Sequence, residues 1–165
     1  MAEITLKGNP IQTNGELPVA GSKAPEFTLL KTDLSELSSN DLKGQRVILN
    51  IFPSIDTPVC QRSTREFNAK ASGLENTAVV CTSVDLPFAM GRFCGAEGLE
   101  DVVPASAFRS DFAVNYGVKQ IDGPLQGLTA RAVVVIDEKG VIIYSQLVGE
   151  IADEPDYDAA IASLS

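Results

Sequence analysis

Three stretches of the chain are apolar almost without interruption, a pattern typical of strands that are buried on both faces of a sheet. They span Val47–Phe52, Ala78–Val84 and Ala130–Asp137. Val141–Val148 has a similar pattern and follows the third of them after a short turn that ends in Gly140, where a hairpin needs a positive φ. These segments indicate a central sheet.

Helical patterns occupy the intervals between the strands. Pro58 suits the first position of a helix that runs to about Ser72, because its missing N–H would have no partner there, and Thr57 can cap that helix. Its inward face is formed by Cys60, Thr64, Phe67 and Ala71. Further helices are expected at Pro87–Glu97, at Asp111–Tyr116 with Gly117 ending it, and at Pro155–Leu164, with Asp153 and Glu154 near its positive end.

Shorter segments complete the pattern. Glu3–Lys7 and Ile11–Thr13 flank a Gly-Asn-Pro turn and predict a small hairpin, while Phe27–Leu30 and Val102–Phe108 predict short strands and Asp41–Gly44 a turn. No repeat, charge block or low-complexity stretch interrupts the chain, so we expect one domain over residues 1–165. Strands that alternate with helices and end in a hairpin and a helix predict an α/β thioredoxin-like fold. Its central mixed β-sheet is flanked by helices and preceded by the N-terminal β-hairpin.

Composition removes several classes of function. The net charge of −9 argues against nucleic acid or an anionic membrane as a partner, since both need clustered lysine and arginine. The chain has no histidine, which excludes Ser-His and Cys-His nucleophile pairs and histidine-bound zinc. No apolar run is long enough to cross a bilayer, and the first residues lack the layout of a secretory signal. With three cysteines in no framework spacing, we expect a reducing compartment, the cytoplasm.

Cys60 is the strongest candidate for chemistry. It follows a buried strand and a loop and falls in the first turn of the helix that Pro58 opens. Free backbone N–H groups and the positive end of the helix dipole favour a thiolate there. A thiolate attacks the O–O bond of a peroxide, which a neutral thiol barely does. The alternative is that Cys60 only packs inward beside Phe67.

The other two cysteines differ in context. Cys94 lies among Gly91, Gly95 and Gly98 in a segment otherwise patterned as helix, and such a helix opens at low cost. Its thiol could then travel to a partner, or one glycine simply ends the helix and Cys94 fills the core. Cys81, in the middle of a buried strand, is expected to act as a small hydrophobe. The spacings among the cysteines match no zinc site and include no C-x-x-C pair, so no metal or other cofactor is expected.

Arg131 is also out of place, since it opens an otherwise apolar strand. A cation there could stabilise a thiolate and bind a polar oxygen of a substrate. The alternative is an arginine that extends its charged end from the strand into solvent.

The segment PSIDTPVC, from Pro53 to Cys60, resembles the peroxiredoxin active-site pattern P-x-x-x-T/S-x-x-C, with matches at Pro53, Thr57 and Cys60. The later active-site arginine of that family falls on Arg131. Four segments, NIFPSIDTPVC, DLPFAMGRFCGAEG, DGPLQGLTARAVVVIDEKG and EPDYDAAIASL, extend the resemblance over nearly the whole chain. They are similar to the thiol peroxidase branch, whose members are atypical two-cysteine peroxiredoxins.

This resemblance implies a role for each matched residue. Cys60 would be the peroxidatic cysteine that becomes a sulfenic acid, and Cys94 the resolving cysteine that forms an intrachain disulfide with it. Thr57 would hydrogen-bond the thiolate and the peroxide, Pro53 would shield the pocket, and Arg131 would hold the thiolate. Hydrogen peroxide or an alkyl hydroperoxide would be the substrate and thioredoxin the reductant, and the protein would be a homodimer.

Two other functions remain open. A thiol-based redox sensor would use the same cysteine chemistry to signal to a partner, and a thioredoxin-like scaffold would have no chemistry at all. Turnover distinguishes them, because a sensor reacts about once per chain. We also expect the Cα atoms of Cys60 and Cys94 to lie beyond the ~7 Å that a disulfide tolerates, so that the glycine-flanked helix must open first.

Overall fold

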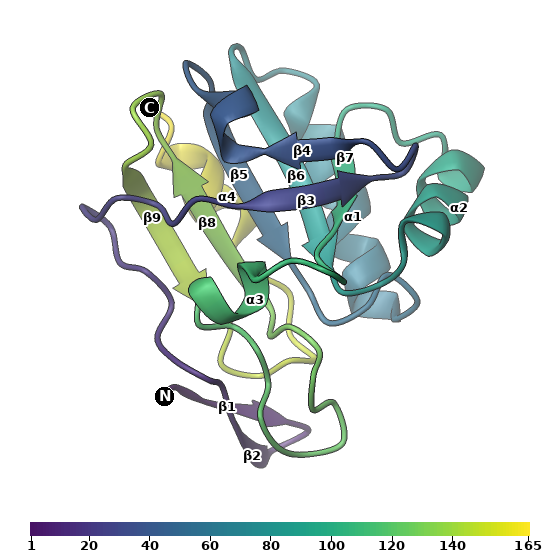
Figure 1. The fold of residues 1–165 in the computed structure, drawn as a ribbon, viewed down its shortest axis with the longest axis vertical. Helices are drawn as coiled ribbons and strands as arrows, with labels where there is room; N and C mark the ends of the chain where they lie inside the picture. Colours follow the sequence, from purple (N-terminus) through teal and green to yellow (C-terminus); the bar gives the residue numbers. More distant parts are fainter.

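A seven-stranded mixed sheet organises the computed structural model, which describes residues 1–165 (Figure 1). The strand order is β4-β3-β7-β6-β5-β8-β9, and β5, β6 and β7 run parallel to one another. Each of the other pairings is antiparallel. The strands are β3 (Thr28–Lys31), β4 (Glu36–Ser38), β5 (Arg46–Ile51), β6 (Thr77–Ser83), β7 (Val103–Ser106), β8 (Ala132–Ile136) and β9 (Ile142–Leu147). The predicted α/β, thioredoxin-like fold is confirmed.

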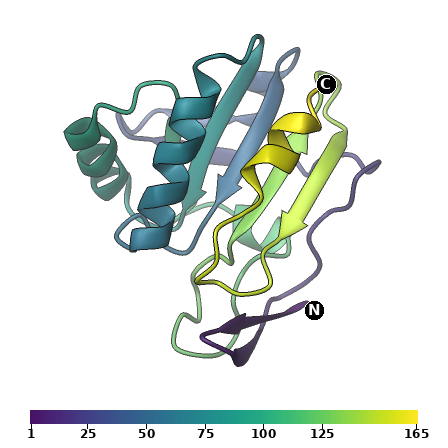
Figure 2. The ribbon, with the colours of Figure 1, turned by 180° about the vertical axis from the view of Figure 1, so that it is seen from behind.

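The helices cover both faces of this sheet. They are α1 (Pro58–Ala71), α2 (Pro87–Glu97), α3 (Phe112–Asn115) and α4 (Tyr157–Ala162), with a 3-10 turn at Ser39–Leu42. Helices α1 and α4 lie side by side on one face (Figure 2), and α3 lies on the other (Figure 1). Helix α2 packs beside β7, towards the edge of the sheet. None of the helices has the length and hydrophobicity that crossing a bilayer requires.

Alternation along the central strands divides the core into two apolar clusters. Val47, Leu49 and Ile51 of β5 belong to the cluster on the α3 face, whereas Ile48 joins the cluster under α1. The remaining strands of the centre alternate in the same way, so the apolar strand pattern does reflect burial on both faces. The cluster under α1 contains both Cys60 and Cys81.

The N-terminal hairpin lies below the seven-stranded sheet in the view of Figure 1. Its turn has the geometry expected of tight hairpins. Strands β1 (Glu3–Leu6) and β2 (Asn9–Gln12) are antiparallel, and Lys7 and Gly8 between them have φ of 50° and 83°. The predicted hairpin is therefore present, but the turn comes earlier than expected, because Asn9 and Pro10 belong to the second strand.

Two further details differ from the sequence prediction. The last helix begins at Tyr157 rather than at Pro155, because the side chain of Asp156 accepts a hydrogen bond from the N–H of Ala159 and caps the helix there. The short strand β4 was not predicted. Its three residues carry too little alternation to distinguish a strand from the loop around it.

Candidate active site

The sequence before Cys60 places its thiol at the start of a buried helix. Strand β5 ends at Ile51, a loop follows, and α1 begins at Pro58, so that Cys60 is its third residue. The first hydrogen bond of this helix runs from the N–H of Gln61 to the carbonyl of Thr57, and no acceptor faces the N–H groups of Val59 and Cys60. The Cys60 side chain is fully buried. Free N–H groups and the helix dipole therefore act on a thiol that is shielded from bulk solvent.

Arg131 lies against the Cys60 thiol and is only 2% exposed. Its Nη2 is 3.4 Å from the Cys60 Sγ, and its Nε donates to the carbonyl of Ile151 at 2.8 Å. The third nitrogen of the guanidinium, Nη1, is buried and has no hydrogen-bond partner. The interpretation that Arg131 extends into solvent is therefore wrong. A buried cation with an unused donor beside a thiol is suited to stabilise an anion or to bind an oxygen atom.

Sheet pairing explains how Arg131 reaches Cys60. Ile51, the last residue of β5, pairs with Ala132, the first residue of the antiparallel strand β8. Arg131 therefore lies next to the loop that leads into α1. Val133 and Val135 belong to the cluster under α1, and Arg131 has the same parity along the strand, so its side chain lies on that face.

The N-terminal hairpin supports the carbonyl that orients Arg131. Ile151 donates its N–H to the carbonyl of Thr5 at 2.8 Å, and Thr5 donates to the carbonyl of Gly149 at 2.8 Å. The Glu150 carboxylate accepts from the N–H of Gly8 at 2.8 Å and from that of Ala152 at 2.9 Å. These hydrogen bonds from backbone amides lower the pKa of Glu150 to about 2. The hairpin thus remains attached to the arginine's support at every pH near neutrality.

Pro53 and Thr57 lie in the loop that joins β5 to α1. Pro53 is buried and Thr57 half-buried. The Thr57 hydroxyl donates to the carbonyl of Ser54 at 2.9 Å and makes no cap hydrogen bond to α1, so the predicted side-chain cap is wrong. Because that hydroxyl uses its hydrogen within the loop, its oxygen is left to accept a hydrogen bond from a ligand near Cys60.

Asp85 is a residue of this site that the sequence analysis missed. Its carboxylate accepts from the N–H of Ile55 at 2.7 Å and from the hydroxyl of Ser54 at 2.8 Å, and thereby fixes the loop before Cys60. A usable signal existed, because Asp85 follows the buried strand β6, next to β5 in the sheet. Polar residues at the carboxyl ends of adjacent parallel strands are common at binding sites.

Cys94 forms no disulfide with Cys60 in this structure. It is a free, buried thiol in α2 and does not join the apolar cluster that contains Cys60. Burial raises its pKa. Gly98 ends α2 with φ of 66°, whereas Gly91 and Gly95 have no positive φ. Gly98 therefore ends the helix. Gly91 and Gly95 remain inside the helix, where each lowers its stability.

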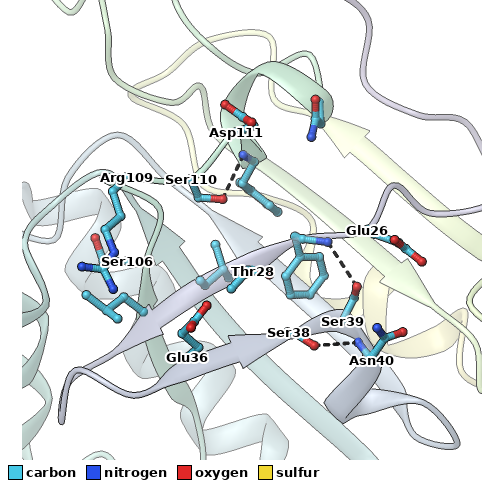
Figure 3. A pocket seen from close by; sticks show the side chains of 15 residues that line it. Glu26, Thr28, Glu36, Ser38, Ser39, Asn40, Ser106, Arg109, Ser110 and Asp111 are labelled. Atoms are coloured by element: carbon cyan, nitrogen blue, oxygen red, sulfur yellow. Dashed lines mark hydrogen bonds between the residues drawn. The ribbon is translucent and has the colours of Figure 1, made fainter.

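A polar groove of about 430 Å³ lies on the α3 side of the molecule (Figure 3), and Cys60 is not among the residues that line it. Arg109, Asp111, Glu26 and Glu36 surround it, and it contains none of the residues singled out above. No cluster of three or more cysteine, aspartate or glutamate side chains is placed to hold a metal ion. The groove is therefore separate from the residues that surround Cys60.

Comparison with known proteins shows the family of this chain. The model of the Redoxin family matches residues 19–161. The chain belongs to the redoxin family. This redoxin is 54% identical to the thiol peroxidase of Corynebacterium glutamicum over the whole of both chains, and 57% identical to that of Mycobacterium tuberculosis over 99% of both. A peroxiredoxin-like protein from Aquifex aeolicus, 39% identical, superimposes with a TM-score of 0.95 and covers 99% of this chain and 96% of its own.

These relatives confirm the resemblance to the thiol peroxidase branch of the peroxiredoxins. The redoxin is accordingly an enzyme, a thiol-dependent peroxidase of the peroxiredoxin type. A more distant likeness, to a thiol peroxidase from Chromobacterium violaceum at 23% identity and a TM-score of 0.87, confirms the fold alone. The chain contains a third free and buried thiol, that of Cys81.

Cys81 lies under α1 and has the surroundings of a packing residue. It is buried in β6, where the Asn50 amide lies 3.6 Å from its sulfur. Burial raises its pKa to about 12, so it is a neutral thiol at physiological pH. We expect Cys81→Ala to keep normal turnover and to lose about 1 kcal/mol of stability, the range of a small core truncation. Steady-state peroxide consumption and chemical denaturation measure both. A folded but inactive Cys81→Ala protein would mean that Cys81, not Cys94, resolves Cys60.

Proposed function

We propose that this redoxin reduces hydrogen peroxide and alkyl hydroperoxides through the thiolate of Cys60. The observation that carries the proposal is the contact between Cys60 and Arg131. A guanidinium nitrogen lies 3.4 Å from the sulfur, a second one is buried without a partner, and the thiol sits at the start of α1. Positive charge from both sources favours the thiolate, and the unused donor can bind the peroxide oxygen on which negative charge develops.

The first chemical step is attack of the Cys60 thiolate on the terminal oxygen of the peroxide. An S–O bond forms while the O–O bond breaks, and the departing alkoxide or hydroxide takes a proton and leaves as an alcohol or water. Cys60 is oxidised by two electrons to a sulfenic acid. Thr57 would accept a hydrogen bond from the peroxide, and Pro53 would shield the sulfur from water.

The second step is resolution by Cys94. Its thiol attacks the Cys60 sulfur, an S–S bond forms, and the S–O bond breaks with release of water. A dithiol reductant, which we propose to be thioredoxin, returns two electrons by thiol–disulfide exchange and becomes a disulfide itself. The cycle needs no cofactor, because thiols carry all of the electrons.

We propose the same setting as the sequence indicated: one domain over residues 1–165, in the cytoplasm, as a homodimer. Exposed apolar side chains support an interface. Leu86 and Phe88 at the start of α2 and Phe108 after β7 are 51%, 65% and 43% exposed. The two segments are joined by a hydrogen bond from the Ser106 hydroxyl to the carbonyl of Asp85. Exposed aromatic and aliphatic side chains of this kind are typical of contact surfaces.

Peroxide consumption coupled to thioredoxin, thioredoxin reductase and NADPH tests the function. A peroxidase consumes many equivalents of peroxide per chain, a redox sensor consumes about one, and a scaffold consumes none. Oxidation of NADPH that stops after one equivalent would favour the sensor and contradict the proposed cycle. Parallel assays with hydrogen peroxide and an alkyl hydroperoxide rank the two substrate classes.

Resolution requires α2 to open, and we expect its amides to lose protection when the protein is oxidised. Helix α2 has low intrinsic stability, because Leu86 at its start makes no side-chain cap and Gly91 and Gly95 lie inside it. Cys94 must leave its buried position to reach a sulfur in a different helix. Hydrogen exchange on reduced and oxidised protein measures the change over Phe88–Gly95, with α1 changing less. Equal protection in both states would refute the opening.

Stiffening α2 is expected to slow the disulfide step. Gly95→Ala adds a methyl group with no atom within 4 Å and no positive φ to forbid it, and alanine stabilises a helix by about 1 kcal/mol relative to glycine. We therefore expect resolution to slow by about fivefold, with more irreversible overoxidation of Cys60. Gly73→Ala, equally open but placed after α1, is the matched control. Equal resolution rates in the two variants would show that helix stability is not limiting.

A further inference from the structure

Asp85 joins the loop before Cys60 to the start of the helix that contains Cys94. We propose that Asp85 is a positioning residue: its carboxylate holds the loop closed and thereby limits how fast the Cys60–Cys94 disulfide forms. This inference rests on the proposed function, since it concerns the rate of one step of that cycle. It assigns to a residue outside the Pro53–Cys60 motif a part in the timing of the cycle rather than in its chemistry.

The carboxylate holds the loop with both oxygens. Oδ1 accepts from the Ser54 hydroxyl at 2.8 Å, and Oδ2 accepts from the N–H of Ile55 at 2.7 Å. Ser54 and Ile55 precede Cys60 by six and five residues and lie between it and β5. Hydrogen bonds to an ionised carboxylate are stronger than those between neutral groups, and this side chain is only partly exposed. The carboxylate thus fixes the loop that leads into α1.

Asp85 is itself held firmly on the other side. The Ser83 hydroxyl donates to the same carboxylate, and the N–H of Asp85 donates back to the Ser83 oxygen at 3.2 Å. The carbonyl of Asp85 accepts from the Ser106 hydroxyl. Ser83 and Ser106 are register partners at the ends of β6 and β7. We call the Asp85 carboxylate with its hydrogen bonds to Ser54 and Ile55 the latch. The latch is therefore anchored to two adjacent strands of the sheet.

The Asp85 carboxylate does not cap α2, although it lies close to the start of that helix. Asp85 lies immediately before Leu86, the N-cap position, where an aspartate would normally be placed to satisfy free N–H groups at a helix start. Here the carboxylate faces the Cys60 loop, and α2 has no side-chain cap and no acidic residue in its first turn. The loop before Cys60 is therefore held by a carboxylate, whereas the helix that must open has no side-chain cap.

Other links between the two regions are exposed and weaker. Asp56 pairs with Arg92 of α2 at 3.0 Å, with 59% and 70% of the two side chains exposed. Arg65 of α1 pairs with Glu97 of α2, also near the surface. Exposed ion pairs contribute little to stability. Asp85 is accordingly the link whose removal should most increase the fraction of molecules in which the Cys60 loop has separated from α2.

Removal of the latch should act oppositely on the two steps. Attack on peroxide needs the closed loop, so it cannot become faster when the loop is released. Disulfide formation needs α2 to open and the Cys60 loop to be free to move towards Cys94, so its rate rises with the fraction of molecules in which the loop is released. Damage to the fold alone would slow both steps. Acceleration of resolution without acceleration of peroxide attack is therefore a signature that a merely structural residue does not produce.

The test compares the two steps in the intact protein carrying Asp85→Ala. Peroxide is mixed rapidly with reduced protein, and samples are quenched at intervals with dimedone, which traps the sulfenic acid, and N-ethylmaleimide. Mass spectrometry then reports the loss of the Cys60 thiol and the appearance of the disulfide separately. We expect disulfide formation about tenfold faster than in wild type, as for the loss of charge-assisted hydrogen bonds, with peroxide attack equal or slower. Less sulfinic acid should accumulate at high peroxide.

Controls separate this inference from the function on which it rests. Asp56→Ala breaks an exposed pair in the same loop and should resolve at the wild-type rate. Ser54→Ala and Asp85→Asn keep part of the latch and should give intermediate acceleration, which keeps the test decisive if Asp85→Ala does not fold. A normal or slower disulfide step in all three latch variants would overturn the role of Asp85. A wild-type protein whose Cys60 does not react with peroxide would instead overturn the proposed function.

Discussion

Cys60→Ser is expected to reduce peroxide turnover to the background of the assay. A serine hydroxyl is not ionised at neutral pH and forms no stable equivalent of a sulfenic acid or a disulfide, so both steps of the cycle are lost. The fold should persist, because serine has nearly the shape of cysteine and Arg131 can donate to its oxygen. The thioredoxin-coupled assay measures turnover, and thermal denaturation checks that the variant is folded.

Cys94→Ser is the informative comparison for this experiment. It keeps the peroxidatic thiol, so it should consume one equivalent of peroxide and stop with Cys60 as a sulfenic acid that dimedone traps. Cys60→Ser should consume none. Substantial turnover in folded Cys60→Ser would reject Cys60 as the site of attack, and together with an inactive Cys81→Ala it would move the reaction to β6.

The position of Cys60 could be predicted because its determinants are local. A continuous apolar strand, a loop and a proline at the first helical position lie within fourteen residues, and each has a direct structural meaning. Helix α1 begins and ends within one residue of its predicted bounds. The first turn of a helix at the carboxyl end of a buried strand is determined by short-range rules, which one sequence contains in full.

Arg131 and Asp85 depend on contacts that no local pattern contains. The parity of β8 gives the face of the sheet on which Arg131 lies, but its contact with Cys60 depends on the pairing of β5 and β8, which are some eighty residues apart. The role of Asp85 depends on the adjacency of β5 and β6 and on the direction of one side chain. Asp85 lies before the N-cap residue Leu86, so helix-capping rules assign it no role, and its function depends on tertiary hydrogen bonds alone.

Arg131→Met is expected to slow the attack of Cys60 on peroxide by about 100-fold to 1,000-fold, the usual cost of removing a positioned donor from a developing anion. Two donors are lost at once, the Nη2 that lies against the sulfur and the unpaired Nη1. The Cys60 sulfur also loses the cationic partner that favours its anionic form. Alkylation of Cys60 by iodoacetamide at neutral pH should therefore slow, while Cys81 and Cys94, whose pKa values are raised by burial, give little background.

Stability distinguishes this role of Arg131 from a structural one. Methionine fills a similar volume without a charge, so the variant avoids the cost of burying a guanidinium that has one unpaired nitrogen, but it also leaves the carbonyl of Ile151 without its donor. These effects oppose each other, and the melting temperature should change little. Arg131→Lys retains the charge but not the fork that reaches the sulfur and the carbonyl together, so its rate should be intermediate. A large fall in melting temperature with an unchanged rate of peroxide attack would show that Arg131 supports the fold and not the thiolate.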